Sequence, residues 1–196
     1  MSTERDAVED LFRRIAACEP RAVELHCAAF RSAGVKYAHE SDLLSGDGAA
    51  RYGGRWNPRG VGAIYASLDP VTAVKESYQE FLEYGFAGAT IRPRVFVGLK
   101  VDLKCVLDLT QVRIRRALGY TISDLVTEDW RAIQAAGEES WTQAIGRGAV
   151  AAGFEALLAP SARNRTGKIL VAFPSNLRTA HAVRVMAADE LLRHPA

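Results

Sequence analysis

The sequence predicts a single α+β domain, and three observations lead to this fold class. The chain has 196 residues, 48% of them hydrophobic and 24% charged, which is the balance of an ordinary globular domain. Strand-like runs occur both between and after helical patterns, without the regular order of a βαβ repeat, so a doubly wound sheet is disfavoured. No internal repeat or shift in composition marks a second domain.

The first sixty residues contain one clear helix, an ambiguous segment and a long loop. Apolar residues from Val8 to Ile15 recur at helical spacing, which predicts a helix over residues 4–17. Residues 22–31 fit either a helix or a strand, with a strand favoured over the last few. Residues 36–60 show little periodicity and much Gly, Ser and Asp, which predicts a long ordered loop. Loops of this length in compact domains are usually functional.

Beyond residue 60 the strands and helices are better marked. Alternating or continuous apolar runs predict strands over residues 61–67, 95–101, 105–109, 154–161 and 168–174. One helix is expected to begin at Pro70 with Asp69 as its N-cap and to end at Gly85. Helical patterns predict three further helices over residues 111–118, 121–136 and 138–152.

Charge and cysteine content narrow the classes of function. A formal net charge of +2 is too small for a protein whose affinity depends on neutralising a nucleic-acid backbone. The three cysteines lie far apart without a C-x-x-C pair, so we expect buried, reduced thiols. The charged N-terminus has no apolar core, and no stretch approaches the roughly 18 apolar residues of a membrane span. We therefore expect a cytoplasmic protein with no membrane association and no direct nucleic-acid binding.

Three motifs suggest a function, but a structural explanation fits each of them better. Residues 146–151, "GRGAVA", match a dinucleotide fingerprint but lie late in a predicted helix and precede a strand, so close helix packing fits better. His39, Glu40 and Asp42 could ligate a metal, yet the other histidines show no matched spacing, and no metal site is expected. The basic cluster at residues 113–116 fits a solvent-facing helix better than a nucleic-acid surface.

The stretch "RYGGRWNPRGVGAIYAS" at residues 51–67 carries the strongest functional signal. Gly54 and the glycine before it could bring backbone N–H groups close to a ligand. Arg55 could present a planar fork to a phosphate, and Tyr65 could offer a ring for stacking. The alternative places Arg55 on the surface, Trp56 in the core and Tyr65 half buried. The residues alone leave both interpretations open.

Glu76 and Ser161 gain no clear role from their positions alone. The apolar residues of the helix around Glu76 gather on one face: Val71, Val74, Tyr78, Phe81 and Leu82. At about 100° per residue Glu76 lies nearly opposite that face, which favours a solvated carboxylate. Ser161 begins a polar loop after an apolar run, where serine is most often a turn or cap residue.

Taken together, these segments resemble the RES domain family of bacterial toxins, named for an Arg, a Glu and a Ser. The resemblance covers residues 30–174 and rests on five segments: "FRSAG", "GGRWNPRG", "AIYAS", "AVKES" and "APSAR". It implies an ADP-ribosyltransferase-like α+β fold, with a split β-sheet core, a central cleft and flanking helices. It also divides the chain into an N-terminal helical extension, residues 1–29, and a RES-like NAD-binding catalytic domain, residues 30–196.

The resemblance implies an enzyme that consumes NAD⁺ by cleaving its nicotinamide–ribose bond, with water or phosphate as the acceptor. Its implied catalytic residues are Arg55, Glu76 and Ser161. Its implied substrate-binding residues are Arg31, Gly54, Trp56, Asn57 and Tyr65. Cleavage passes through an oxocarbenium-like state that a carboxylate stabilises, and nicotinamide leaves as a neutral base, so no metal is expected.

Other functions and partners follow from the same resemblance or compete with it. The first alternative is a mono-ADP-ribosyltransferase that modifies a protein target. A rival of another class is a non-catalytic nucleic-acid-binding module that uses residues 113–116 and the arginines of the loop after Ser161. The family implies an antitoxin partner of the Xre helix-turn-helix type, and a homodimer is also allowed.

Overall fold

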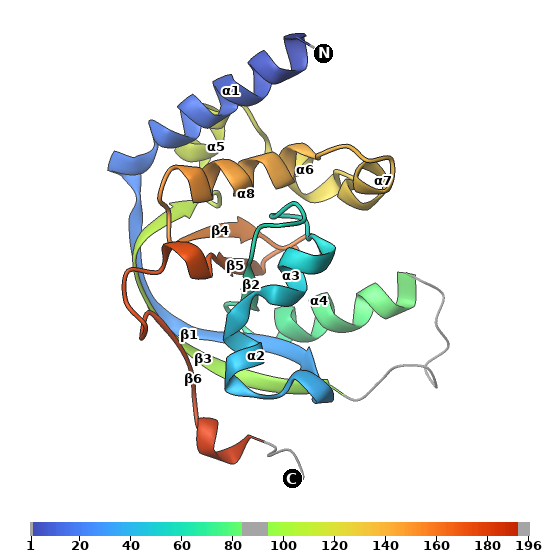
Figure 1. Cartoon of the computed structure of the whole chain (residues 1–196), viewed down its shortest axis with the longest axis vertical. Coiled ribbons are helices and arrows are strands. Elements are labelled where there is room, and N and C mark those ends of the chain that lie inside the picture. The colour runs from blue at the N-terminus through green and yellow to red at the C-terminus, as the bar shows by residue number, and fades with distance from the viewer. Residues whose placement is uncertain (1, 84–93, 192–196) are drawn as a thin grey trace.

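A curved six-stranded sheet lies between two groups of helices (Figure 1). The structure, a computed structural model, describes residues 2–83 and 94–191. The strands are β1 (Val23–Gly34), β2 (Ile64–Ser67), β3 (Arg94–Asp108), β4 (Ala156–Pro160), β5 (Lys168–Ala172) and β6 (Val183–Val185). The helices are α1 (Ser2–Ala16), α2 (Glu40–Ser45), α3 (Asp47–Tyr52), α4 (Pro70–Glu83), α5 (Val112–Leu118), α6 (Ile122–Thr127), α7 (Trp130–Ala135) and α8 (Trp141–Ala151).

The strand pairing confirms the α+β class and shows how the sheet is built. The strand order is β1-β2-β5-β4-β3-β6, and β1 also pairs with β3. All pairs are antiparallel except β3 and β4, which run parallel. The long β1–β3 ribbon and the short β2–β5–β4 unit form two halves. Phe30 of β1 pairs with Ser67 of β2, and residues 106–108 of β3 pair with β4, so the two halves are joined. The split sheet that the resemblance implied is therefore one continuous sheet with a bend.

The β1–β3 ribbon resolves two uncertainties in the sequence. Residues 22–31 belong to a strand, because β1 pairs with β3 along nearly its whole length. Strand β3 is one element with buried Leu99, Val101 and Leu103 on one face, whereas the sequence predicted two strands, over residues 95–101 and 105–109. Polar positions in the sequence suggest that a strand ends, but pairing with a long neighbouring strand keeps the chain extended through them.

Three segments differ from the sequence prediction. The loop expected over residues 36–60 contains helices α2 and α3, each of six residues, and α2 buries Leu43 completely. The helix expected over residues 121–136 is divided into α6 and α7, because Glu128 leaves the helical conformation and Asp129 caps α7. Strand β6 was not predicted, since three residues carry no readable period. The predicted helix end at Gly85 lies outside the described residues.

Helix α8 packs closely against both its neighbours through two glycines. A Cβ on Gly146 would lie 1.7 Å from the carbonyl oxygen of Trp56, and one on Gly148 would lie 2.6 Å from the side chain of Ile15 in α1. Because α8 begins at Trp141, these glycines sit inside the helix and not at its N-terminus. The close-packing interpretation of "GRGAVA" is therefore confirmed.

The hydrophobic core lies on both faces of the sheet. One cluster joins α1, α5 and α8 to the sheet and includes Leu11, Ile15, Trp56, Ile145 and Phe154. The other lies inside the bend of the β1–β3 ribbon around Leu43, Leu99 and Leu170. The three cysteines are free, with Cys18 and Cys105 buried and Cys27 half-buried. Within the described residues, none of the helices is both long enough and apolar enough to cross a membrane.

Candidate active site

Helix α4 buries a face that its sequence did not predict. Thr72 and Ala73 are buried, whereas Val71 and Val74 are 59% and 44% exposed. Val71 and Val74 of the assigned apolar seam therefore do not lie on the packed face, whereas Tyr78 of the same seam is half-buried and stacks on Phe96. The side chains of Phe81 and Leu82 lie outside the described part. Gly167 explains the difference, because a Cβ there would lie 2.3 Å from the Thr72 hydroxyl. This close approach turns the face of Thr72 and the half-buried Glu76 toward the protein.

Ser161 holds the Glu76 carboxylate. Its Oγ donates a hydrogen bond of 2.5 Å to Glu76 Oε1 and accepts bonds from the backbone N–H groups of Arg163 and Asn164. The hydroxyl has one proton, and the two N–H groups occupy its lone pairs, so the proton is directed at the carboxylate. Ser161 is thus a turn residue, as its position in the sequence predicted. Its hydroxyl also connects the β4–β5 loop to α4.

A chain of polar contacts fixes α4 on the same loop. Asp69 caps the helix by accepting from the Thr72 N–H at 2.8 Å and from its hydroxyl at 2.6 Å, which confirms the predicted N-cap. Asn164 Nδ2 donates to the Thr72 hydroxyl at 2.7 Å, and Lys75 reaches Asn164 Oδ1 at 3.2 Å. The first two turns of α4 are therefore held in register with the loop that carries Ser161.

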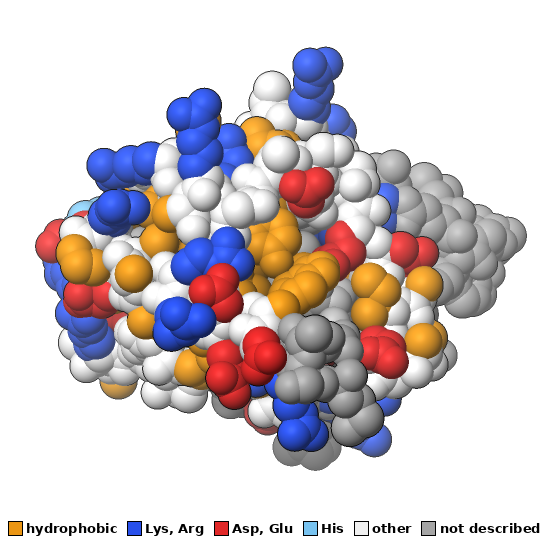
Figure 2. Space-filling view, turned by 90° about the horizontal axis from the view of Figure 1, so that it is seen from above, with side chains coloured by type: hydrophobic (Ala, Val, Ile, Leu, Met, Phe, Trp, Pro, Cys, Tyr) orange, Lys and Arg blue, Asp and Glu red, His pale blue; other side chains and the backbone are white. Residues whose placement is uncertain are grey.

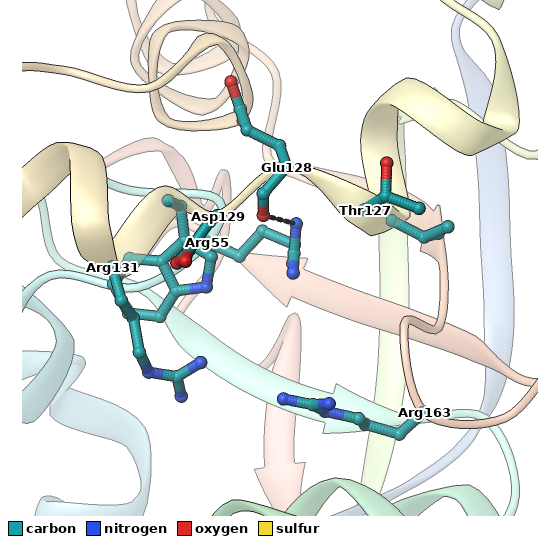
Figure 3. Close-up of a pocket in the computed structure, with 8 residues that line it drawn as sticks. Arg55, Thr127, Glu128, Asp129, Arg131 and Arg163 are labelled. Carbon is teal, nitrogen blue, oxygen red and sulfur yellow. Dashed lines mark hydrogen bonds between the residues drawn. The ribbon is translucent and has the colours of Figure 1, made fainter. Parts of the chain in front are cut away.

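Arg55 lines an open cavity of about 330 Å³ beside this pair (Figure 3). Its Nη1 donates to the carbonyl oxygens of Leu125 and Glu128 at 3.2 and 2.9 Å, which fixes the guanidinium at the end of α6. Arg131 and Arg163 also line the cavity. In Figure 3 their guanidinium groups enter the space from opposite sides, with Arg55 behind them.

The electrostatic surroundings of Arg55 connect the cavity to Glu76. Burial lowers the pKa of Arg55, and the positive charges of Arg163 and Arg131 lower it further. The carboxylates of Glu128 and Glu76 oppose this shift and raise the pKa of Arg55. Arg55 therefore lies within electrostatic reach of all four groups, and Glu76 is one of the two carboxylates that oppose the shift.

The acidic residues at the cavity wall accept hydrogen bonds from backbone N–H groups at the starts of two helices. Glu128 accepts hydrogen bonds from the backbone N–H groups of Trp141 and Thr142 at 2.8 and 2.9 Å, at the N-terminus of α8. Figure 3 shows its side chain extending away from Arg131 and Arg163. Asp129 accepts from the N–H of Ala132 at 3.1 Å and caps α7. Three arginines line the cavity, and their positive charge suits an anionic ligand.

The two residues after Arg55 are buried and stabilise the loop that carries it. Trp56 and Asn57, expected to bind substrate, have no exposed surface. Asn57 Nδ2 donates to the carbonyl oxygens of Ala49 and Val61 at 2.9 and 2.8 Å. A Cβ on Gly54 would lie 2.4 Å from the Tyr65 hydroxyl, so this glycine makes room for a side chain and not for a ligand.

Tyr65 binds the loop that carries Arg55, and Arg31 in turn binds the backbone of Tyr65. The Tyr65 hydroxyl donates to Asn57 Oδ1 at 2.7 Å and accepts from the Trp56 N–H at 2.9 Å, so its polar tip is engaged within the protein. Arg31 Nη1 donates to the Tyr65 carbonyl at 2.9 Å. Desolvation, together with the charge of Arg94, lowers the pKa of Arg31 to about 10. Only the half-exposed ring of Tyr65 remains for contact with a ligand.

Arg131 is the cavity residue that the sequence did not reveal. It lies within a stretch predicted as one long helix, and only the division at Asp129 turns it toward the cavity. The N-cap preference of Asp129 is the signal that could have located this division. Arg163 was noticed only as part of the nucleic-acid alternative.

The motifs assigned simpler roles do not form further sites among the described residues. Arg115, from the basic cluster, is buried and donates to the Leu109 carbonyl at 2.8 Å, so the cluster is not a continuous basic surface. On the face formed by the upper helices, basic and acidic side chains both surround an apolar area (Figure 2). Within the described ranges, no group of three or more His, Cys, Asp or Glu side chains is placed to hold a metal ion.

Residues 28–194 match the family model of the RES domain. The chain belongs to the RES domain family. It is 30% identical over 106 residues to the NAD(+) phosphorylase MbcT of Mycobacterium tuberculosis and of Mycobacterium bovis. That alignment includes 51% of this chain and 55% of each relative, so the chain spans about half the length of the curated relatives it matches.

A solved structure supports the RES assignment at the level of the fold. The crystal structure of the Mycobacterium tuberculosis MbcT–MbcA toxin–antitoxin complex matches with a TM-score of 0.71 and 28% sequence identity. The match covers 90% of this chain and 88% of that chain. The family resemblance and the α+β fold class predicted from the sequence are therefore confirmed.

Proposed function

We propose that this RES domain protein cleaves the bond between nicotinamide and ribose in NAD⁺. The observation that carries the proposal is the carboxylate of Glu76, held by Ser161 and within electrostatic reach of Arg55, which lines a cavity together with Arg131 and Arg163. A diphosphate needs several cationic donors, and guanidinium groups bind phosphate oxygens in pairs. The name of the MbcT relatives, NAD(+) phosphorylase, supports the same substrate.

The chemistry assigns one role to each part of the site. As the bond between C1′ and the nicotinamide nitrogen breaks, its electron pair leaves with nicotinamide, and positive charge develops on the ribose. Glu76 stabilises this charge, which is present only near the transition state. An oxygen of the acceptor then bonds to C1′, and the acceptor loses its proton to the solvent if it is water.

We favour inorganic phosphate as the acceptor. The arginine-lined cavity suits a second anion as well as the diphosphate, and the MbcT relatives are named as phosphorylases. Nicotinamide release measured in phosphate buffer and in phosphate-free buffer separates the acceptors. Phosphorolysis requires phosphate and yields a phosphorylated ADP-ribose, whereas equal rates in both buffers would indicate hydrolysis. Labelled protein after incubation with labelled NAD⁺ would instead indicate transfer to a protein.

Glu76→Gln tests the catalytic role directly. Glutamine keeps the size of the side chain and an oxygen that accepts from Ser161, but it lacks the negative charge. We expect nicotinamide release to fall by about 10²-fold to 10³-fold, the effect of removing one strong electrostatic contact from a transition state. The matched control is Glu138→Gln, which neutralises an exposed glutamate and should retain activity. Full activity of Glu76→Gln would contradict the assignment.

We also propose that the chain acts as a cytoplasmic toxin restrained by an antitoxin of the Xre helix-turn-helix type. The solved MbcT structure, a toxin bound to its antitoxin, supports this role. Expression of the chain alone should arrest growth and lower cellular NAD⁺, and Glu76→Gln should do neither. Normal growth of cells that express an active chain would contradict the toxin role.

A further inference from the structure

A second cavity, of about 400 Å³, adjoins the arginine-lined one. Trp130 and Arg131 line both cavities, so the two lie on either side of these residues. The other walls of the second cavity include Tyr52, Arg59 and Gln134. These walls come from α3, the loop after it and α7, whereas Glu76 lies on α4.

The groups along the two cavities follow a fixed order. Ser161 and Glu76 lie beside the first cavity, because the backbone N–H of Arg163, a residue that lines this cavity, binds Ser161 Oγ. Arg163 and Arg131 approach the first cavity from opposite sides (Figure 3). Arg131 then borders the second cavity, so the order runs from the carboxylate through the guanidinium groups to the space beside Tyr52.

This order matches the order of groups in a dinucleotide. If the nicotinamide ribose lies at Glu76 and the diphosphate lies among the arginines, the second nucleoside must continue past Arg131. The second cavity has the volume for one nucleoside and offers two aromatic side chains, Tyr52 and Trp130. Aromatic rings stack on nucleobases because both present flat, polarisable faces.

The wall of the second cavity is fixed by hydrogen bonds. Gln134 Nε2 donates to the Tyr52 carbonyl at 3.1 Å, and Gln134 Oε1 accepts from Gln143 Nε2 at 2.8 Å. Gly53 has a φ of 76°, and a Cβ there would lie 2.1 Å from Gln134 Oε1. The first glycine of the "GGRWNP" segment therefore permits the close approach that positions Tyr52.

We propose that the second cavity binds the adenosine half of the substrate, with the Tyr52 ring in contact with adenine. Trp130 offers a second aromatic surface in the same cavity, and Arg131, which lies over the Trp130 ring, stands between adenosine and the diphosphate. The identity of the ligand as an adenine dinucleotide rests on the proposed function.

Tyr52→Ala tests the site, with Tyr37→Ala as a matched control. Both tyrosines are exposed, by 61% and 49%, and each has a neighbouring cation over its ring, so neither substitution removes core packing. We expect Tyr52→Ala to raise KM for NAD⁺ about tenfold, within the range for loss of one base–aromatic contact, and to leave kcat unchanged. Nicotinamide mononucleotide has the same scissile bond without adenosine, so its turnover should be equal in wild type and Tyr52→Ala.

Binding of adenosine monophosphate provides a readout that does not depend on catalysis. Calorimetry should show about tenfold weaker binding to Tyr52→Ala than to wild type or to Tyr37→Ala. If NAD⁺ is not cleaved, the proposed function fails while this binding difference still supports the adenosine site. If NAD⁺ is cleaved but Tyr52→Ala changes neither KM nor this affinity, the adenosine site is overturned and the proposed function stands.

Discussion

One hydroxyl group, that of Ser161, connects the two segments that form the candidate site. It is 6% exposed, and its hydrogen bonds join the β4–β5 loop to Glu76 on α4. The hydrogen-bond partners of its hydroxyl in the described part of the chain are a carboxylate and two backbone N–H groups, and none of them is a histidine. Its geometry favours a positioning role, in which the hydroxyl sets the rotamer of the carboxylate.

Ser161→Ala should lower kcat by about 100-fold, because a carboxylate displaced by even about 1 Å stabilises the transition state poorly. Ser161→Thr keeps the hydroxyl and should restore part of the lost kcat. Steady-state kinetics of both variants, with circular dichroism to verify folding, measure the effect. Equal kcat for wild type and Ser161→Ala would show that Glu76 does not depend on this contact.

At the scale of the elements, helix α8 determines where the loop with Arg55 can lie. Gly146 places the helix against the backbone of Trp56, the residue that follows Arg55. The capping box at the start of α8, with Ser140 as N-cap, fixes the beginning of the helix. The carboxylate of Glu128 also binds this N-terminus, so α8 helps to position two residues that line the cavity, Arg55 and Glu128.

Gly146→Ala should lower the free energy of unfolding by about 3 kcal/mol, because the added methyl group meets backbone atoms that cannot rotate away. The displaced loop should also reduce nicotinamide release. Gly48→Ala is the control: it lies in α3 with no heavy atom within 4 Å of the added Cβ, and it should be neutral or stabilising by up to about 1 kcal/mol. Urea denaturation compares the two, and equal midpoints would contradict the packing argument.

At the scale of the whole molecule, the buried carboxylate of Glu155 connects the sheet to the segment between β5 and β6. Glu155 is 1% exposed and accepts from the backbone N–H groups of Lys104 and Cys105 at 2.7 and 3.0 Å. Its other oxygen accepts from the N–H of Arg178 at 3.0 Å. Strands β3 and β4 are thereby linked to the chain that leads to β6.

Glu155→Ala should lower the free energy of unfolding by about 3 kcal/mol or more, since three backbone donors lose their acceptor. Glu24→Ala is the matched control, because Glu24 bonds only to exposed side chains among the described residues and its loss should change stability little. Thermal and urea denaturation measure both variants. A similar loss for Glu24→Ala would indicate a general effect of charge and not of the buried carboxylate.

Much of the secondary structure was readable because it depends on local periodicity. The alternation in β3, the apolar spacing in α1 and the cap of α4 each involve residues close in the chain. The short helices α2 and α3 and strand β6 escaped prediction, because each is too short to show a period. Tertiary contacts stabilise elements of this length, and such contacts leave no local pattern.

The candidate site was readable only in part. The order of the "GGRWNP" segment, Tyr65, Glu76 and Ser161 was enough to indicate the family, because motif order is a property of the chain. The orientation of Glu76 could not be predicted from the sequence, since the buried face of α4 depends on the space that Gly167 leaves for Thr72. Trp56 and Asn57 resembled ligand-binding residues in the sequence, but tertiary packing encloses them completely.

By itself, the sequence determined that this protein is an α+β member of the RES domain family, with its motif residues in a fixed order. Only the tertiary structure decided which residues meet: Arg131 with Arg163 at one cavity, Ser161 with Glu76, and Tyr52 with Trp130 at the next. The physical reason is that side-chain direction depends on close contacts between distant segments. Those contacts are governed by steric fit, which periodicity along the chain does not encode.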